Sequence, residues 1–287
     1  MRRYVVMAAG PIQARPREYV ESWLRLQDSD PQTNFRVFSD DVGSVFVRAE
    51  FACRLPLEVV RADFEVASAD WSLEAWHLQA LDSPRILVLA SRTDHCLHEL
   101  LALQQQGRLA GEIVQVVSNH PDLRSLVEVY GVPFLAIEWP SQQAKSATGA
   151  AAPIQLARLI KASGAGLVVM ARFMRVIPPE LCAIEPVINV HHACTVAFPG
   201  GNTHRRMRER GVKVLTATAH YATAGLDEGP IITQEVRPVE SLGPAPSTSA
   251  LQAASRPIEA SALVTAVNWH CKGELLVWRG RTVHLAP

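Results

Sequence analysis

The sequence has no excess of charge of either sign, because its 28 Lys and Arg residues balance 28 Asp and Glu residues. A protein without net charge has no whole-molecule field that would attract nucleic acid or an anionic membrane surface. No apolar run approaches the roughly 20 residues that a membrane-spanning helix requires. These absences predict a protein that works without nucleic acid or membrane, and they leave room for a local basic pocket that takes an acidic ligand.

Cysteine is scarce and irregularly spaced. The five cysteines among 287 residues are odd in number and lack Cys-x-x-Cys spacing, which is not the pattern of a disulfide framework. Reduced thiols are the simplest interpretation, so we expect a cytoplasmic protein. The stretch Met1–Met7 is basic and then apolar, and the apolar run ends at Gly10 and Pro11. It therefore lacks the apolar core of a signal peptide, and we interpret it as a first strand.

The remaining composition, with 48% hydrophobic and 20% charged residues, is typical of a globular protein with a sizeable core. Its first part alternates between strand and helix patterns. Residues 4–8 and 43–52 are predicted strands, whereas residues 16–27 and 56–67 carry apolar side chains at helical spacing. The order strand, helix, strand, strand, helix indicates a small α+β module.

The pattern changes at Pro84. The apolar run Arg85–Ala90 is typical of a strand that is buried on both faces. Helices then alternate with strands, which predicts a doubly wound, mainly parallel sheet with ligands beyond the carboxyl ends of its strands. The predicted strands are 113–117, 134–137, 167–170, 187–190 and 215–221, and the predicted helices are 94–107, 123–130 and 153–162.

Two segments of small and polar residues are predicted to lack regular structure. Residues 142–152 have the composition of a surface segment, and residues 243–257 that of a loop. Pro153 would then stand at the start of a helix, where a missing N–H costs least. A closing helix at 260–271 and a hairpin of 275–278 with 282–285, turning at Gly280, complete the expected elements.

The densest group of polar residues, Asn189-Val190-His191-His192, ends an apolar strand. A second group, Thr218–Tyr221, also ends a strand and is followed by the turn-forming stretch Gly225–Pro230, which contains Asp227. Asn, His and Asp together suit attack on a formyl or acyl carbon. The amide or a protonated imidazole can donate to the oxyanion of a tetrahedral intermediate, and the carboxylate can accept a proton from the nucleophile.

Plainer interpretations of these residues stay open at this point. A His at a strand end is usually a satisfied structural group, and a Gly-rich acidic segment is usually only a turn. His192 could instead be the active residue, or it could bind a metal together with His191 and His220. Adjacent residues of a strand point to opposite faces, so the His pair is expected to bind one metal poorly. We therefore expect no metal.

The stretch from Asn189 to Pro230 resembles the 10-formyltetrahydrofolate deformylase family, part of the formyltransferase superfamily. The spacing of His191 and Asp227, 36 positions (227 − 191), matches that superfamily. Further stretches that resemble the family occur in its order and are Asp94-His95-Cys96-Leu97, Ser118–Asp122, Val168–Met174, Ala217–Tyr221 and Asp227–Ile232.

The resemblance implies an ACT-like domain over residues 1–83 and a formyltransferase-like, Rossmann-type catalytic domain over residues 84–287. It implies Asn189, His191 and Asp227 as catalytic residues. The first two would stabilise the intermediate, and Asp227 would activate the attacking water and carry protons to the leaving N10. His220 and His192 would support them. Contacts with the folate are expected from Arg172, Phe173, Met174, Val176, Tyr221, Leu226 and Gly229, although Arg172 could also be a plain surface charge.

The chain departs from the family beside the His pair. Ala193–Val196 replaces the family's Ser-Phe-Leu-Pro, and Pro199–His204 replaces a segment like Ile-Gly-Ala-Asn-Pro-Tyr. The altered wall would face the second reactant, so an amine could replace water as the nucleophile. The wall residues are Cys194, Thr195, Gly201, Asn202 and His204. The turn Ala8–Gln13 also lacks the family's Asp-Arg-x-Gly pattern, which makes an effector site in the first domain doubtful.

Three hypotheses follow from the residues and the resemblance. The first is a hydrolase that converts 10-formyltetrahydrofolate and water to tetrahydrofolate and formate. The second is a formyltransferase that moves the same group to an amine of a small metabolite. The third is a protein that binds folate without turnover, which the complete catalytic trio argues against. Its partners would be small molecules and further copies of the chain, as a dimer or tetramer, because ACT-like domains often pair.

Overall fold

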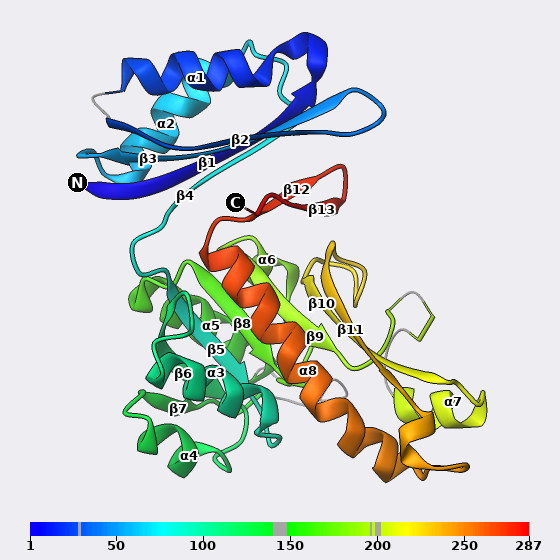
Figure 1. Ribbon diagram of the computed structural model, residues 1–287. Helices are drawn as coiled ribbons and strands as arrows, with labels where there is room; N and C mark the ends of the chain where they lie inside the picture. The colour runs from blue at the N-terminus through cyan, green and yellow to red at the C-terminus, as the bar shows by residue number, and fades with distance from the viewer. Residues whose placement is uncertain (28–29, 140–147, 196, 199–201, 287) are drawn as a thin grey trace. The chain divides into compact units, whose positions relative to one another are not determined.

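The computed structural model describes residues 1–27, 30–139, 148–195, 197–198 and 202–286 (Figure 1). The chain divides into two compact units, one of residues 1–83 and 269–287 and one of residues 84–268. The predicted division placed residues 269–287 in the second domain. They belong to the first unit because Leu276 and Trp278 are buried in an apolar cluster with Val5 of the first strand.

The first unit is built on a four-stranded antiparallel sheet of order β2-β3-β1-β4. Two helices lie on one face of this sheet in Figure 1, and a separate hairpin, β12–β13, completes the unit. The strand order along the chain agrees with the predicted module and adds β4 at its end. The elements are β1 (Arg2–Pro11), η1 (Ile12–Ala14), α1 (Pro16–Leu26), β2 (Asp30–Ser39), β3 (Ser44–Cys53), α2 (Leu57–Ser68), β4 (Ala75–Ala80), β12 (Leu275–Trp278) and β13 (Arg281–His284).

The strand β1 is apolar throughout because both of its faces are covered. Alternate residues of a strand point to opposite sides. Tyr4 and Val6 pack in a cluster with Trp23 of α1, whereas Val5 and Met7 pack in a second cluster with residues of the C-terminal hairpin. The continuous apolar run at the start of the sequence is thus a core strand.

The second unit contains a seven-stranded sheet of order β11-β10-β9-β8-β5-β6-β7. The strands from β9 to β7 in this order are parallel, and β10 and β11 are antiparallel to their neighbours. The sheet is therefore mixed and mostly parallel. The elements are β5 (Arg85–Ala90), α3 (His95–Gln105), β6 (Glu112–Ser118), α4 (Arg124–Val129), β7 (Phe134–Ala136), α5 (Thr148–Ser163), β8 (Leu167–Ala171), α6 (Pro179–Cys182), β9 (Val187–His191), α7 (Thr203–Glu209), β10 (Val214–Tyr221), β11 (Ile231–Pro238), η2 (Glu240–Leu242) and α8 (Thr248–Cys271).

Two predictions about irregular segments were wrong. Part of 142–152 lies outside the described residues, but α5 already begins at Thr148, so Pro153 lies inside the helix. Likewise, most of 243–257 belongs to α8, which begins at Thr248 and contains Pro257. Both segments are rich in alanine, the best helix former, and each proline removes only one backbone N–H from its helix.

Within the described residues, no helix combines the length and apolarity required to cross a membrane. The longest helix, α8, has polar residues buried along it, among them Ser255 and Glu259. Ser255 contacts His204, and Glu259 contacts Arg172, near the candidate active site.

A buried histidine makes the stability of the first unit depend on pH. Burial, followed by the charge of His77, lowers the pKa of His270 from 6.5 to about 3. Between these values the unfolded chain binds the proton and the folded chain does not, so the free energy of unfolding falls as pH falls below 6.5. One such group contributes up to about 1.4 kcal/mol per pH unit.

We expect His270→Gln to remove about one proton's worth of this pH dependence. Urea unfolding between pH 5 and 8, followed by tryptophan fluorescence, measures it, because five of the six tryptophans lie in the first unit. The exposed His98 provides a matched control, and His98→Gln should leave the slope unchanged. Equal slopes for wild type and His270→Gln would contradict the assignment.

Candidate active site

The three predicted catalytic residues lie together in the second unit. Asn189 and His191 belong to the end of β9, and Asp227 lies in the turn between β10 and β11. The Nδ1 atom of His191 is 3.1 Å from Oδ2 of Asp227, and Nε2 of His220 is 3.7 Å from Oδ1. The Asp227 carboxylate is thus held between two imidazole rings, with its side chain only 8% exposed.

Sheet register brings Asn189 to His220. The two residues face each other directly across the antiparallel pair of β9 and β10, where opposite side chains share one face of the sheet. Nδ2 of Asn189 is 3.3 Å from Nε2 of His220, and Nδ1 of His220 is 3.0 Å from the carbonyl oxygen of Tyr221. His220 therefore faces the carbonyl oxygen of Tyr221 with Nδ1, and both the Asn189 amide and the Asp227 carboxylate with Nε2.

Hydrogen bonding defines the charge of the central pair. Nε2 of His191 is 2.9 Å from the carbonyl oxygen of Phe198, and its Nδ1 faces Asp227, so both ring nitrogens face acceptors. Only the imidazolium form donates from both nitrogens. Hydrogen bonds from His191, and then from His220, hold the pKa of Asp227 well below its usual range. The site therefore contains a carboxylate ion beside a cationic donor.

The turn that carries Asp227 depends on glycine. Asp227 has a left-handed backbone conformation, with φ of 58°. A Cβ atom added at Gly229 would overlap the backbone carbonyl of Tyr221, whereas one added at Gly225 would meet only the flexible side chain of Glu228. Close approach of the two backbone segments at Gly229 is thus what fixes Asp227 beside His191.

A small cavity of about 50 Å³ adjoins these groups. Its walls include Asn189, His220 and Asp227. Such a volume is large enough for an ordered water molecule. The complete lining is Met170, Arg175, Val176, Ile177, Asn189, His220, Ala222, Thr223, Ala224, Gly225, Leu226 and Asp227.

Of the residues predicted to bind folate, Val176 and Leu226 line this cavity. Both are largely exposed, as is Met174. Phe173 is instead buried in the core, where its ring packs edge-to-face against that of Trp139, with 5.3 Å between centroids. Tyr221 and Gly229 shape the turn through their backbones, and the side chain of Arg172 points to other partners, described below.

Arg175 was missed by the sequence analysis although it lines the cavity. In the flipped amide orientation, the Asn119 side-chain oxygen accepts from Nε of Arg175 at 3.0 Å. Asn119 lies within the family-like stretch Ser118–Asp122, whereas Arg175 directly follows the stretch Val168–Met174. The available signal was therefore an arginine in the segment that follows the carboxyl end of the buried strand β8.

The two adjacent histidines do not point to opposite faces, contrary to the prediction. The rings of His191 and His192 stack with centroids 5.0 Å apart, and His192 stacks on His204 at 4.9 Å. Strand β9 ends at His191, so the two-residue alternation of an extended strand no longer applies to His192. His192 is neutral, because burial and the charge of Arg172 lower its pKa to about 3.

Only some of the residues predicted to face a second reactant are accessible. His204 is buried, and its Nε2 lies 2.9 Å from the Ser255 hydroxyl, while Thr195 is also buried. Cys194 is half-buried, and its sulfur receives a long hydrogen bond from Gln234. Asn202 is exposed and precedes α7. Gly201 lies outside the described residues.

One group of potential metal-binding atoms occurs among the described residues, formed by His95, Cys96 and Glu259. The Glu259 carboxylate already contacts the His95 ring and Arg172. Burial raises the pKa of the Cys96 thiol well above its usual range, so it is not a thiolate. These donors fit a protein ion pair better than a metal ion. His191, His192 and His220 form no such group within the part of the chain that the structure describes.

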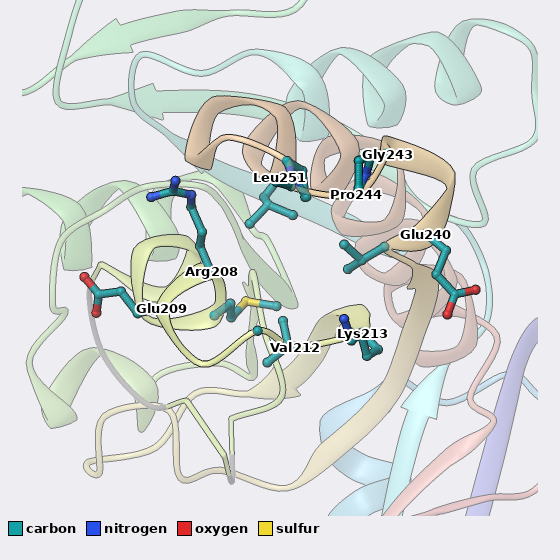
Figure 2. Close-up of a pocket in the computed structure, with 13 residues that line it drawn as sticks. Arg208, Glu209, Val212, Lys213, Glu240, Gly243, Pro244 and Leu251 are labelled. Carbon is teal, nitrogen blue, oxygen red and sulfur yellow. The ribbon is translucent and has the colours of Figure 1, made fainter.

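A larger cavity lies elsewhere in this unit. It has a volume of about 670 Å³ and lies between α7, η2 and the start of α8, with Val212 and Leu251 among its lining residues. Figure 2 shows the charged ends of Arg208, Glu209 and Glu240 turned away from its centre. No titratable group of the trio reaches it, so its size does not identify it as the reaction site.

Comparison with known proteins gives one consistent result. A model of the formyl transferase family matches residues 84–267. The chain is 40% identical over 250 residues to a formyltetrahydrofolate deformylase of Corynebacterium sp. (strain P-1), covering 85% of this chain and 84% of that protein. It is 34% identical over 245 residues to the deformylase of Escherichia coli (strain K12), with 85% and 84% covered.

Solved structures extend the similarity over both units. The crystal structure of a formyltetrahydrofolate deformylase from Pseudomonas syringae pv. tomato has a TM-score of 0.83 and 29% identity, covering 100% of this chain and 95% of that chain. A glycinamide ribonucleotide transformylase 1 from Symbiobacterium toebii has a TM-score of 0.65 and 28% identity, and covers 73% of this chain and 97% of its own. Of these two structures, the deformylase resembles the chain over its full length.

The Gly229 contact gives a test of the site geometry. We expect Gly229→Ala to lower the free energy of unfolding of the second unit by at least about 2 kcal/mol, because the added Cβ must displace backbone. Gly225→Ala, in the same turn, is the matched control and should change it by less than about 1 kcal/mol. Thermal unfolding of both variants measures the difference. Equal stability of the two variants would show that the turn tolerates the displacement.

Proposed function

The chain belongs to the formyl transferase family, and we propose that it hydrolyses 10-formyltetrahydrofolate to tetrahydrofolate and formate at the site of Asn189, His191 and Asp227. The observation that carries the proposal is the carboxylate of Asp227. It is ionised, held by two imidazole rings, and placed on a cavity wall beside the Asn189 amide. The likeness to proteins named formyltetrahydrofolate deformylase over both units supports water as the second reactant.

Stabilisation of negative charge is the first task of the site. Addition of water to the formyl carbon turns its oxygen into an oxyanion, which needs hydrogen-bond donors already in place. The Asn189 amide supplies one donor from Nδ2, which now lies against His220. The second is the N–H at Nδ1 of His191, which now points at Asp227. Both donors reach the oxyanion by turning away from partners inside the site.

Asp227 orients and deprotonates the water. A carboxylate with a depressed pKa is a weak base while it remains paired. Its pKa is low chiefly because His191 donates to it. When His191 redirects that N–H to the oxyanion, Asp227 loses the donor and its proton affinity rises. Stabilisation of the intermediate and strengthening of the base thus occur in one movement.

The proton balance of the reaction follows from these roles. Water forms the new C–O bond and gives one proton to Asp227. The intermediate then breaks its C–N10 bond, the bonding electrons go to N10, and Asp227 returns the proton there. The products are tetrahydrofolate, with N10–H, and formic acid, which loses its proton to solvent as formate. No covalent bond to the protein is required.

The folate is proposed to bind where the cavity adjoins Val176 and Leu226. The volume of about 50 Å³ is smaller than a pterin ring system, so we expect the turn of residues 222–229 to move outward when the ring enters. Arg175 at the same cavity offers a cation for the acidic tail of the ligand. Arg172 and Phe173, with buried side chains, contribute backbone only.

The first unit is proposed to be an ACT-like domain that serves assembly of a homodimer or homotetramer. Its support is the element order β1-α1-β2-β3-α2-β4 on one antiparallel sheet. The turn after β1 forms the short helix η1 and carries none of the acidic or basic side chains of the family's effector turn. We therefore propose no effector site in this unit. We propose a cytoplasmic location for the protein.

Formate release without an acceptor tests the proposed function. We expect purified protein to convert 10-formyltetrahydrofolate to equal amounts of tetrahydrofolate and formate in buffer alone, because water is the nucleophile. Absorbance for the folate and enzymatic formate detection measure both products. Release that stays slow until an amine is added, with a formylated amine as product, would assign the protein to formyl transfer instead.

The role of Asp227 is tested by Asp227→Asn. We expect kcat to fall by at least about 10²-fold, which is typical for loss of a general base, while calorimetric binding of tetrahydrofolate changes little. The neighbouring Glu228 is exposed and offers a matched control, so Glu228→Gln should keep wild-type turnover. Near-normal kcat in Asp227→Asn would show that another group is the base.

A further inference from the structure

A chain of buried polar side chains lies behind the catalytic histidine. NH1 of Arg172 is 2.6 Å from Nδ1 of His192, and Nε of Arg172 is 3.4 Å from the Glu259 carboxylate. The ring of His192 in turn stacks on that of His191, with 5.0 Å between centroids and 29° between planes. We infer that Arg172 and Glu259 are positioning residues that hold His192 as a neutral ring against His191. This inference rests on the proposed function and adds residues outside the catalytic trio.

The tautomer of His192 follows from its two partners. A guanidinium group only donates hydrogen bonds and stays charged at any accessible pH. Nδ1 of His192 must therefore be the unprotonated acceptor, and the ring proton lies on Nε2. That N–H donates to the hydroxyl of Thr203 at 2.8 Å. Both ring nitrogens are thus occupied by partners that fit only one neutral form.

Glu259 balances the positive charge of Arg172, so this group of buried side chains carries no net charge. Its side chain is 3% exposed and that of Arg172 15%, so both charges are largely removed from water. Buried charges require a partner. Glu259 accepts a hydrogen bond from Nε2 of His95 at 2.9 Å, so its carboxylate is held by one hydrogen bond and one ion pair from different elements. The pair supplies the hydrogen bond to His192 without adding net charge beside the catalytic centre.

A neutral His192 matters because of what lies on each side of it. The ionisable and charged groups around the ring are Arg172 after β8, Glu259 on α8, His191 on β9, and His204 on α7, whose ring stacks on the other face. Two imidazolium rings in stacked contact would repel each other. With His192 held neutral, the proton that His191 shares with Asp227 has no competing site in the stack.

Nitrogen-15 NMR of histidine-labelled protein tests the inference without reference to activity. In wild type we expect His192, assigned by loss of its signals in His192→Gln, to keep a bare Nδ1 and a protonated Nε2 from pH 5.5 to 8.5. In Arg172→Met the buried Glu259 remains, so His192 should gain a second proton within this range. Arg205→Met breaks an exposed Arg–Glu pair on α7 and is the matched control. A protonated Nδ1, or ordinary titration, of His192 in wild type would overturn the inference.

Turnover provides the second readout. We expect Arg172→Met to lower kcat about 10-fold to 100-fold, as typical for a displaced catalytic group, and to shift the acid limb of its pH profile upward, with KM within about 3-fold. Arg172→Lys should restore part of the loss. The double variant Arg172→Met with Glu259→Gln removes both charges and should exceed either single variant in kcat. An unchanged pH profile in Arg172→Met, despite a protonated His192, would contradict the positioning role. Absence of formate release in wild type would instead count against the proposed function, while the NMR result still decides this one.

Discussion

The ion pair of Asp227 with His191 is the contact on which the site depends. A carboxylate with so little exposure needs donors, because an unpaired buried charge is far costlier than a buried apolar group. The fold supplies them from two neighbouring strands: His191 at the end of β9 and His220 near the end of β10. The antiparallel pairing of β10 with β9 makes this possible, because it places His220 directly opposite Asn189 on β9.

Local pattern and the resemblance to the family together predicted the trio, and tertiary contacts decided what surrounds it. Asn189 and His191 end a strongly apolar strand, and Asp227 lies in a glycine-rich turn, so both were visible along the sequence. The arrangement of His192 was not, because its direction depends on where β9 ends and on Arg172, which follows a different strand. Glu259 was invisible for a similar reason. It lies 67 positions (259 − 192) beyond His192, on a helix whose pattern of alanines and polar residues marks no single position as functional.

The fold shows the same division. The buried strands β5, β8 and β9 were predicted nearly to the residue, because continuous apolar runs have few alternatives. Segments read by composition alone were wrong where alanine and proline gave opposite signals, as at the starts of α5 and α8. The C-terminal hairpin was predicted as an element, but its membership in the first unit depends on where Trp278 is buried, which no periodicity reveals.

The low pKa of Asp227 is compatible with its proposed role as a base. It keeps the resting carboxylate ionised at any ordinary pH, so no substrate meets a protonated site. The strength of the base then depends on where His191 directs its Nδ1–H, and the oxyanion draws that donor away as it forms. This arrangement works only if the proton stays on His191. An ordinary histidine stacked against it would compete for that proton. The ion pair of Arg172 and Glu259 has no net charge and fixes the tautomer of His192, so that His192 does not compete for this proton. The buried side chains behind His191 and the Asp227 carboxylate in front of it therefore both depend on the proton staying on His191.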